Sequence, residues 1–534
     1  MMIKKAQIDW ILLFLFGLLS LFFIVLFYAS LPDSYLDQLF NTDSLYLPSL
    51  YKDFFIEHGK VTSWSFNSSP NFVPDMLLYF PMNWMIGNFR LTAIVFSLFQ
   101  QMLLMFLVYS LLRRFFGKDA NVYSGLIVLL SIIFLLSFLL GNEYYLSFLY
   151  VSNTFHVGTF VMALICLKLS FVYVEKKKIG ILVLMLFLQL IAFLSDRLFL
   201  ILFTAPAFFT FILFWKNRQS LILAISQLLV GLTGFIIFNN LSEWFHIKVG
   251  SPHRINQISY FFEALQVLIQ HFTAILSRFD IVSLIWILAI ISFITGGIIV
   301  LRNYRKILFV AQPDLPLVYL LFSTFFFPMV IIAPLLNGNY TGFDTVRYII
   351  FAFYLAIFNI PLILWFYRSQ INPKVVRITG IILFTVLFGF GIFLTSKINL
   401  VKQISHIANY YPPYVEMVDK VVAEENLKFG LANYWDAKFI TMFSKSGVKI
   451  YSALDDLNAY YHVSNQDWYY GCSNCDIGVK EFNFIIFDRF AWRDVVNQLM
   501  NQDSRLIHND NLELLITKPF VMSRLTYKPV FKNN

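Results

Sequence analysis

The sequence predicts an all-α membrane domain that crosses the bilayer about eleven times and is followed by a small α/β domain. The chain has 534 residues, of which 59% are hydrophobic and only 13% charged, whereas an ordinary soluble protein has about 25% charged residues. Apolar runs recur through the first 400 residues and stop there. Because too few polar side chains remain to coat a soluble surface, we assign residues 1–400 to the membrane and 401–534 to a soluble domain.

A hydrocarbon core about 30 Å thick is crossed by roughly 20 apolar residues in a helix. The first run is too long and too aromatic for a removable signal peptide and has no small-residue cleavage site, so we interpret it as a retained anchor. The predicted spans are Trp10 to Ser30, Leu91 to Leu112, Tyr123 to Leu140, Thr154 to Val174, Ile179 to Leu194, Leu198 to Trp215, Leu221 to Phe238, Ile281 to Val300, Leu315 to Leu335, Tyr348 to Tyr367 and Ile378 to Thr395.

Lysine and arginine occupy every second gap between these runs, which predicts the orientation of the chain. By the positive-inside rule the gaps with cations are cytoplasmic, as is the N-terminus. The other gaps, including a long first loop over residues 31–90, then face outside, and so does the soluble domain. We therefore expect a multi-pass protein of a bacterial inner (plasma) membrane with a periplasmic C-terminal domain. The formal charge of +9 lies in these short clusters, so we expect no nucleic-acid partner.

The soluble domain alternates short helical and extended patterns, which favours an α/β layered fold with a partly parallel sheet. Predicted helices are Tyr414 to Asn426, Asp436 to Ser446 and Trp492 to Asn501. Predicted strands are Lys428 to Ala432, Val448 to Tyr451, Phe482 to Asp488 and Leu512 to Thr517.

Ionisable side chains gather on the predicted external side, where a one-sided site is expected. Asp43 lies in the first external loop, and a carboxylate there could deprotonate an incoming hydroxyl group. Asp75, at the far end of the loop, is a second catalytic candidate, and Glu57 is a further acid of the same loop. The alternative for Asp43 and Asp75 is that each simply caps the helix that follows it.

Arg347 and Tyr348 stand at the mouth of a late span, where a guanidinium suits a phosphate group. The alternative is an arginine that reaches the lipid headgroups or pairs with Asp344. Asp196 and Arg197 form another charged pair at an external helix end, for which a structural ion pair is the simpler interpretation.

His253 and Arg254, in the gap over residues 239–280, could meet an anionic headgroup. Cys472 and Cys475 lie in the predicted external domain, where a short-loop disulfide is the first interpretation. A zinc site lacks further cysteine ligands, and a thioredoxin-like dithiol would need a clearer strand before it and helix after it. The sequence has no Walker loop, HExxH or GxSxG motif, so cytosolic nucleotide chemistry is unsupported.

This layout resembles the GT-C superfamily of membrane glycosyltransferases, and most of all the bacterial relatives of protein O-mannosyltransferases and lipid A aminoarabinose transferases. The resemblance covers roughly the first 400 residues and depends on the first span, the early Asp43, the number of spans and the late Arg347. It implies that Asp43 acts as the base and that Arg347, with Tyr348 and Arg254 as further candidates, contacts the donor phosphate. The chain departs from the usual adjacent acidic pair, because Ser44 follows Asp43.

The resemblance further implies transfer of a sugar from a polyprenyl-phosphate donor to an envelope acceptor, which could be a glycolipid, polysaccharide or protein. Some relatives use a divalent metal, but no clear ligand cage is visible in the sequence, so a metal is not expected to be obligatory. The other interpretations are a flippase for lipid-linked sugars and a scaffold. Charge concentrated on one face favours a one-sided enzyme over a transporter.

The predicted external domain has an aromatic-rich set that would suit carbohydrate faces. We expect this domain to hold or select the acceptor, although packing explains many single aromatic residues. The set consists of Trp435, Asp436, Trp468, Tyr469 and Tyr470.

Overall fold

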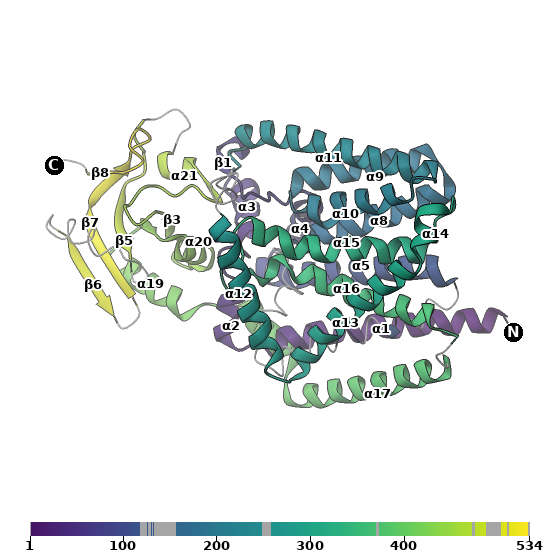
Figure 1. Ribbon diagram of the computed structural model, residues 1–534. Coiled ribbons are helices and arrows are strands. Elements are labelled where there is room, and N and C mark those ends of the chain that lie inside the picture. Colours follow the sequence, from purple (N-terminus) through teal and green to yellow (C-terminus); the bar gives the residue numbers. More distant parts are fainter. Residues whose placement is uncertain are drawn as a thin grey trace.

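A helical part and a C-terminal α/β region lie end to end in the computed structural model (Figure 1). The structure describes residues 2–117, 125–126, 130, 132, 156–247, 258–369, 373–471, 476–487, 504–509 and 512–531. The helical part extends to residue 408, and we use the term C-terminal region for residues 413–531.

Long apolar helices make this a multi-pass membrane protein. Within the described residues six helices are long and apolar enough to cross a bilayer. They are α5 (Phe89–Phe116), α8 (Val157–Lys176), α11 (Arg218–Trp244), α13 (Ile281–Arg302), α15 (Leu315–Leu336) and α17 (Pro373–Lys397).

Four more predicted spans correspond to other helical segments. The end of α1 (Met2–Ala29) qualifies as a span together with α2 (Asp33–Leu39), across a bend of 111°. Three segments are apolar but shorter: α9 (Ile179–Ser195), η5 with α10 (Leu200–Thr204 and Ala205–Leu213) and α16 (Ile350–Phe366). Most of the predicted span from Tyr123 to Leu140 lies outside the described residues, and the total of about eleven stays a prediction.

Polar caps define where several of these helices begin. The side-chain oxygen of Asn88 accepts hydrogen bonds from the backbone N–H groups of Arg90 and Leu91 at the start of α5. Asn217 caps α11 and Asp280 caps α13 in the same way. Such caps satisfy backbone donors that have no partner within the helix.

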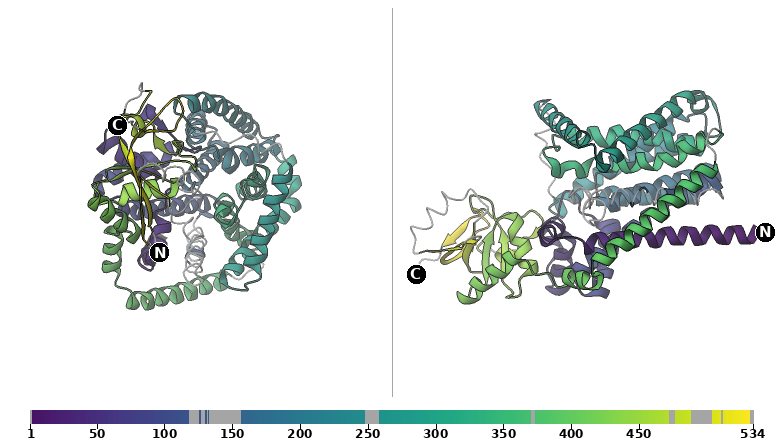
Figure 2. Two further views of the ribbon diagram at one scale, coloured as in Figure 1. Left: turned by 90° about the vertical axis from the view of Figure 1, so that its left-hand side faces the viewer. Right: turned by 90° about the horizontal axis from the view of Figure 1, so that it is seen from below.

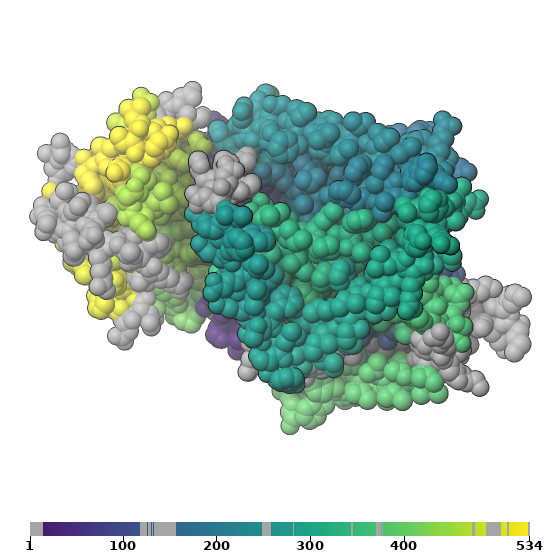
Figure 3. Space-filling model, viewed as in Figure 1, coloured from purple at the N-terminus to yellow at the C-terminus, as the bar shows by residue number. Residues whose placement is uncertain are grey.

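The helices differ in how much of their surface other parts of the protein cover. In the most apolar stretch of α8, 78% of the residues are buried inside the protein, whereas in that of α17 only 11% are buried. Helix α8 is therefore central and α17 peripheral (Figures 1 and 2). The C-terminal region covers one end of the bundle and leaves its sides open (Figure 3). Large apolar side chains such as Ile236 and Val386 are exposed on these sides, which is compatible with contact to lipid.

Two segments expected as loops contain helices. Residues 31–90 fold into α2, α3 (Tyr46–Tyr51), η1 (Lys52–Ile56), η2 (Val61–Ser63), β1 (Trp64–Ser65), η3 (Phe72–Met76) and α4 (Leu77–Ile86). The gap over residues 239–280 contains α12 (Ile258–Leu276), and two short helices, α14 (Tyr304–Phe309) and η7 (Phe343–Tyr348), flank α15. Segment 31–90 is therefore a folded platform.

The C-terminal region contains a mixed six-stranded sheet in the order β3-β2-β5-β7-β6, with β8 also paired to β7. The strands are β2 (Phe429–Ala432), β3 (Lys449–Ser452), β5 (Phe482–Ile486), β6 (Arg505–Asn509), β7 (Leu512–Met522) and β8 (Pro529–Phe531). Strand β2 is parallel to β3 and β5, whereas β7 is antiparallel to its neighbours. The predicted partly parallel sheet is confirmed.

Helices α19 (Pro413–Glu424) and α20 (Tyr434–Phe443) match two predicted helices, and α21 (Asp467–Tyr470) is short. Helix α18 (Leu400–Ala408) leads into the region. The predicted helix from Trp492 to Asn501 lies outside the described residues.

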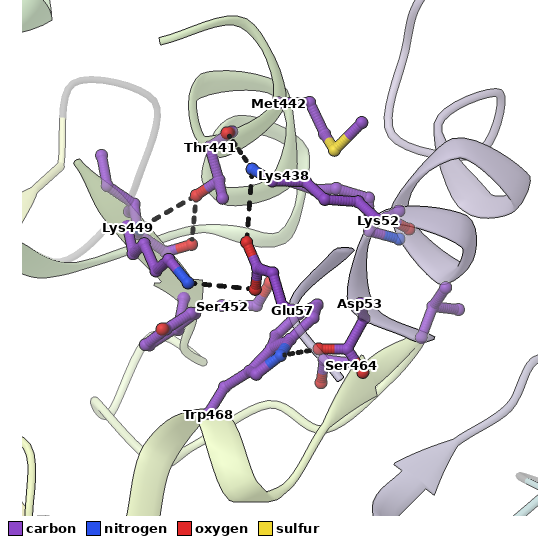
Figure 4. A pocket seen from close by; sticks show the side chains of 14 residues that line it. Lys52, Asp53, Glu57, Lys438, Thr441, Met442, Lys449, Ser452, Ser464 and Trp468 are labelled. Carbon is purple, nitrogen blue, oxygen red and sulfur yellow. Dashed lines mark hydrogen bonds and ion pairs between the residues drawn. The ribbon is translucent and has the colours of Figure 1, made fainter. Parts of the chain in front are cut away.

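The C-terminal region is docked on segment 31–90 by a buried polar contact. Strand β1 pairs with β4 (Ser464–Asn465) of the C-terminal region. Beside this pair the buried carboxylate of Asp53 accepts hydrogen bonds from Trp64 Nε1 at 2.5 Å and Asn465 Nδ2 at 2.9 Å. It also accepts one from Trp468 Nε1 at 2.7 Å (Figure 4). Gly59 permits this arrangement, because a Cβ there would overlap the Asp53 carboxylate.

Replacing Asp53 with alanine should destabilise the docked arrangement. The change leaves three N–H donors without their acceptor, and each unsatisfied buried donor costs roughly 1–3 kcal/mol. We expect a clearly lower thermal unfolding midpoint for Asp53→Ala in detergent. Asp476→Ala, at an exposed aspartate of the C-terminal region, is the matched control and should unfold like the wild type. Equal midpoints for both variants would contradict the assigned role of Asp53.

Candidate functional site

An open pocket of about 680 Å³ lies where the helical part meets the C-terminal region. This volume is typical of small-molecule sites, which occupy roughly 300–1,000 Å³. The helical part contributes Asp43 and Arg347. The C-terminal region contributes most of the lining, including Tyr434, Trp435, Leu454, Asp455, Asp456, Tyr460 and His462. We call this space the Asp43 pocket.

Asp43 is held between a guanidinium and a phenol. It lies in the turn between α2 and α3, where Asn41 Oδ1 accepts a hydrogen bond from the Ser44 N–H. Asp43 Oδ2 lies 3.2 Å from Arg347 Nη1, and Asp43 Oδ1 accepts a hydrogen bond of 3.0 Å from the Tyr434 hydroxyl. Burial and the Asp43 charge raise the pKa of Tyr434 well above its usual value, so the phenol keeps its proton and donates.

The turn that contains Asp43 also fixes α20. The hydroxyl of Thr42 donates a 2.7 Å hydrogen bond to the Trp435 carbonyl. Asn433 caps α20 by accepting from the backbone N–H groups of Trp435 and Asp436. The Asp436 carboxylate is buried and accepts a hydrogen bond from the Asn433 amide. Asp436 is therefore a structural residue at this helix start.

Arg347 reaches the pocket from η7, immediately before α16. This turn is closed by Thr345, whose hydroxyl donates to the Gly342 carbonyl at 2.5 Å. The Arg347 guanidinium lies 5.2 Å from the centre of the Tyr348 ring, and its Nη2 is 3.5 Å from the Tyr348 hydroxyl. The structure thus brings together Asp43, Arg347 and Tyr348.

Asp75 and Asp196 belong to a separate buried cluster and do not line the Asp43 pocket. Gln100 Nε2 donates a 2.8 Å hydrogen bond to Asp75, whose carboxylate packs against Gly158. Asp196 Oδ2 lies 2.5 Å from His156 Nδ1 and accepts a 2.6 Å hydrogen bond from the Thr159 hydroxyl.

Two side chains beside these carboxylates, His156 and Arg197, each lie near an aromatic ring. The His156 ring lies 6.1 Å from the Tyr348 ring, so the cluster approaches the Arg347 side of the pocket. The expected ion pair between Asp196 and Arg197 is replaced by the pair with His156, and Arg197 lies 4.9 Å above the Phe238 ring.

The two carboxyl groups of the cluster have opposite pKa shifts. Burial and the nearby Asp196 charge raise the pKa of Asp75 to about 8. Burial alone would also raise the pKa of Asp196, but the charge and hydrogen bond of His156, with the Thr159 hydroxyl, bring it down to about 2. At neutral pH Asp75 is therefore largely protonated beside an ionised Asp196, as expected for two acids that share a buried site.

A smaller cavity of about 30 Å³, large enough for a water molecule, lies between segment 31–90 and α20 (Figure 4). Glu57 bridges two lysines at its edge, at 3.0 Å from Lys449 and 3.6 Å from Lys52. Glu57 is thus a docking residue. The Lys438 amine lines this cavity and has no hydrogen-bond partner in the described part of the chain. Burial, opposed by Asp43, lowers the pKa of Lys438 to about 7.

The predicted aromatic set divides into structural and exposed members. Trp468 donates to Asp53, and the Tyr469 hydroxyl donates to the Ser452 carbonyl. Tyr470 hydrogen-bonds to Tyr461. Trp435, about half exposed, is the member that lines the Asp43 pocket.

Several pocket residues were absent from the sequence prediction, although the sequence held a signal for them. Tyr434 follows β2, and Asp455 and Asp456 follow its parallel neighbour β3. Ligands of α/β sheets bind beyond the carboxyl ends of such strands. Both strands were predicted from the sequence, so the residues that follow them could have been assigned to one binding site.

Four predicted residues lie outside the described residues: His253, Arg254, Cys472 and Cys475. In the described part of the chain no three His, Cys, Asp or Glu side chains are placed to hold a metal ion.

No protein-family model, curated protein or solved structure matches this chain.

The buried Asp75 should make stability depend on pH. Its folded-state pKa of about 8 exceeds the value of about 4 expected in the unfolded chain. Its stabilising contribution is therefore complete below about pH 4 and is lost as the pH rises towards about 8. The amide in Asp75→Asn imitates the protonated acid, so the thermal midpoint of this variant should fall less than that of the wild type between about pH 5 and 8. Asp476→Asn should keep the wild-type slope, and an unchanged slope in Asp75→Asn would contradict the assignment.

Proposed function

We propose that this protein is a membrane glycosyltransferase that moves a sugar from a polyprenyl-phosphate donor to an acceptor on the external face of the membrane. The observation that carries the proposal is the Asp43–Arg347 pair at an open pocket between the membrane helices and the C-terminal region. In this pair, the residue that the family resemblance would assign as the base contacts the residue that it would assign to the donor phosphate.

Each residue of the pair would have one role in the reaction. Asp43 accepts the proton of the acceptor hydroxyl, whose oxygen forms the bond to the anomeric carbon. The bond between that carbon and the phosphate oxygen breaks, its electron pair leaves with the lipid phosphate, and the anomeric centre inverts. Arg347 stabilises the phosphate charge that grows as the bond breaks.

Donor binding would also change the state of the base. In the structure the Asp43 carboxylate is engaged by Arg347 and Tyr434. A donor phosphate that pairs with Arg347 takes this cation away from Asp43. The Asp43 oxygen that contacts Arg347 is then available to accept a hydrogen bond from the acceptor hydroxyl, while the Tyr434 hydroxyl still holds the other oxygen.

The substrates would enter from two sides. A polyprenyl tail fits the lipid-exposed sides of the bundle, while its phosphate reaches the pocket at the bundle end. The acceptor would approach from the C-terminal region, where Trp435 and Tyr460 line the same pocket. The sugar, the acceptor and the length of the lipid are for experiment to identify.

The test is sugar transfer by the full chain in lipid, with a panel of radiolabelled polyprenyl-phosphate sugars and cell-envelope acceptor fractions. We expect Asp43→Asn to lower turnover about 10²–10⁴-fold, the usual contribution of a general base, and Arg347→Ala to weaken both donor binding and turnover. Asp33→Asn, at an exposed aspartate of the same segment, is the matched control and should stay active. Absence of transfer with every donor, together with movement of lipid-linked sugar across the bilayer, would replace this proposal with a flippase.

Trp435→Ala should affect the acceptor more than the donor. The half-exposed indole lines the side of the pocket formed by the C-terminal region, so its removal should raise the acceptor KM about tenfold and leave the donor KM nearly unchanged. Trp215→Ala, at a similarly exposed tryptophan elsewhere in the chain, is the control. An equal rise in both KM values would contradict acceptor binding by Trp435.

A further inference from the structure

A second open pocket, of about 600 Å³, lies beside the Asp43 pocket and is lined by the C-terminal region and by His246 of the helical part. Its lining includes three tyrosines and three polar residues, Tyr461, Tyr470, Tyr527, Asn458, Gln466 and Arg524. We call it the tyrosine pocket. Its volume also falls within the roughly 300–1,000 Å³ of small-molecule sites.

The aromatic wall of the tyrosine pocket is held by its own contacts. The hydroxyl groups of Tyr461 and Tyr470 are hydrogen-bonded to each other. The Tyr461 ring lies 6.0 Å from the Tyr527 ring, and the Arg524 guanidinium lies 4.4 Å above the Tyr470 ring. Tyr527 is 51% exposed, so its ring is available to a ligand while its neighbours keep their places.

The polar groups of the pocket are suited to hydroxyl ligands. Asn458 donates from its amide nitrogen to Asp456, while its Oδ1 has no hydrogen-bond partner among the residues that the structure describes. The Arg524 guanidinium, a group with several N–H donors, pairs at 3.6 Å with Asp467, which neutralises its charge. Aromatic faces beside amide and guanidinium groups match a pyranose ring, which has apolar C–H faces and a rim of hydroxyl groups.

The two pockets adjoin along one turn of the chain. Leu454 lines both of them, and the consecutive residues Tyr460 and Tyr461 line the Asp43 pocket and the tyrosine pocket respectively. A linear ligand that crosses Leu454 therefore enters both.

We propose that the tyrosine pocket is a saccharide subsite, and that the acceptor is an oligosaccharide that extends from it to the Asp43 pocket. This inference rests on the proposed glycosyltransferase function. A peptide acceptor is the competing occupant, because proline-rich peptides also dock on aromatic rings. The amide and guanidinium groups that stand between the tyrosines favour a ligand rich in hydroxyl groups.

The test measures binding separately from transfer. The full chain in nanodiscs is titrated with neutral linear gluco-, manno- and N-acetylglucosamine oligosaccharides of about two to six sugars and with the single sugars, and binding is followed by saturation-transfer NMR. We expect affinity for at least one series to increase with length. Tyr527→Ala and Tyr461→Ala should weaken binding of the longer members at least about fivefold, whereas Tyr527→Phe, which keeps the ring, should bind nearly as the wild type.

Tyr304→Ala is the matched control, because Tyr304 is 48% exposed and lies in α14 at the opposite end of the bundle (Figure 1). It should leave saccharide binding unchanged. Tyr527 is the main test position, because its exposed ring can be removed with little risk to folding. The proposal is overturned if no saccharide binds, if Tyr527→Ala binds as tightly as the wild type, or if only an unstructured Ser/Thr-rich peptide binds.

The same titration with Asp43→Asn separates this inference from the function on which it rests. If oligosaccharides bind through Tyr527 but no sugar is transferred by any form of the protein, the glycosyltransferase proposal fails and the saccharide site remains. If transfer depends on Asp43 but Tyr527→Ala uses long and short acceptors as well as the wild type, the subsite fails and the function remains.

Discussion

The buried carboxylate of Asp53 determines how the two halves of this protein meet. A carboxylate removed from water is costly unless donors surround it, and here the donors come from both halves, from Trp64 on one side and Asn465 and Trp468 on the other. The hydrogen bonds fix the register of β1 against β4. This contact places α20 against the turn that contains Asp43. The Asp43 pocket therefore depends on an interaction outside its own lining.

Local patterns in the sequence were sufficient to predict the helices and strands, but not which residues far apart in the chain contact one another. Apolar runs located most of the helices, and alternating patterns located β2, β3 and β5. Both are properties of neighbouring residues. By contrast, Asp43 and Arg347 are 304 residues apart, and no local periodicity connects them. Only the family resemblance gave both residues a role in one reaction, and their contact at 3.2 Å was not predicted.

The two acidic candidates also show that a local sequence pattern does not predict tertiary structure. Asp43 and Asp75 occupied similar positions in the sequence, each in a polar stretch of the first loop. In the structure Asp43 lines an open pocket, whereas Asp75 is buried beside Gln100 and Gly158. The difference arises because segment 31–90 is folded, so that distant helices decide which acid reaches solvent. Burial of a polar side chain is a tertiary property, and a single sequence indicates it weakly.

The charge of the Asp43 pocket affects how a donor would reach it. The lining carries Arg347 against Asp43, Asp455 and Asp456, which gives a formal charge of +1 − 3 = −2 with histidine neutral. Such a pocket repels free phosphate and soluble sugar phosphates that come within about 8 Å, the distance over which charges act at physiological salt. An anion anchored in the bilayer is less affected, because its tail holds it at a high local concentration while it diffuses laterally. The pocket would thus reject most anions dissolved in the surrounding water and admit those delivered by the membrane.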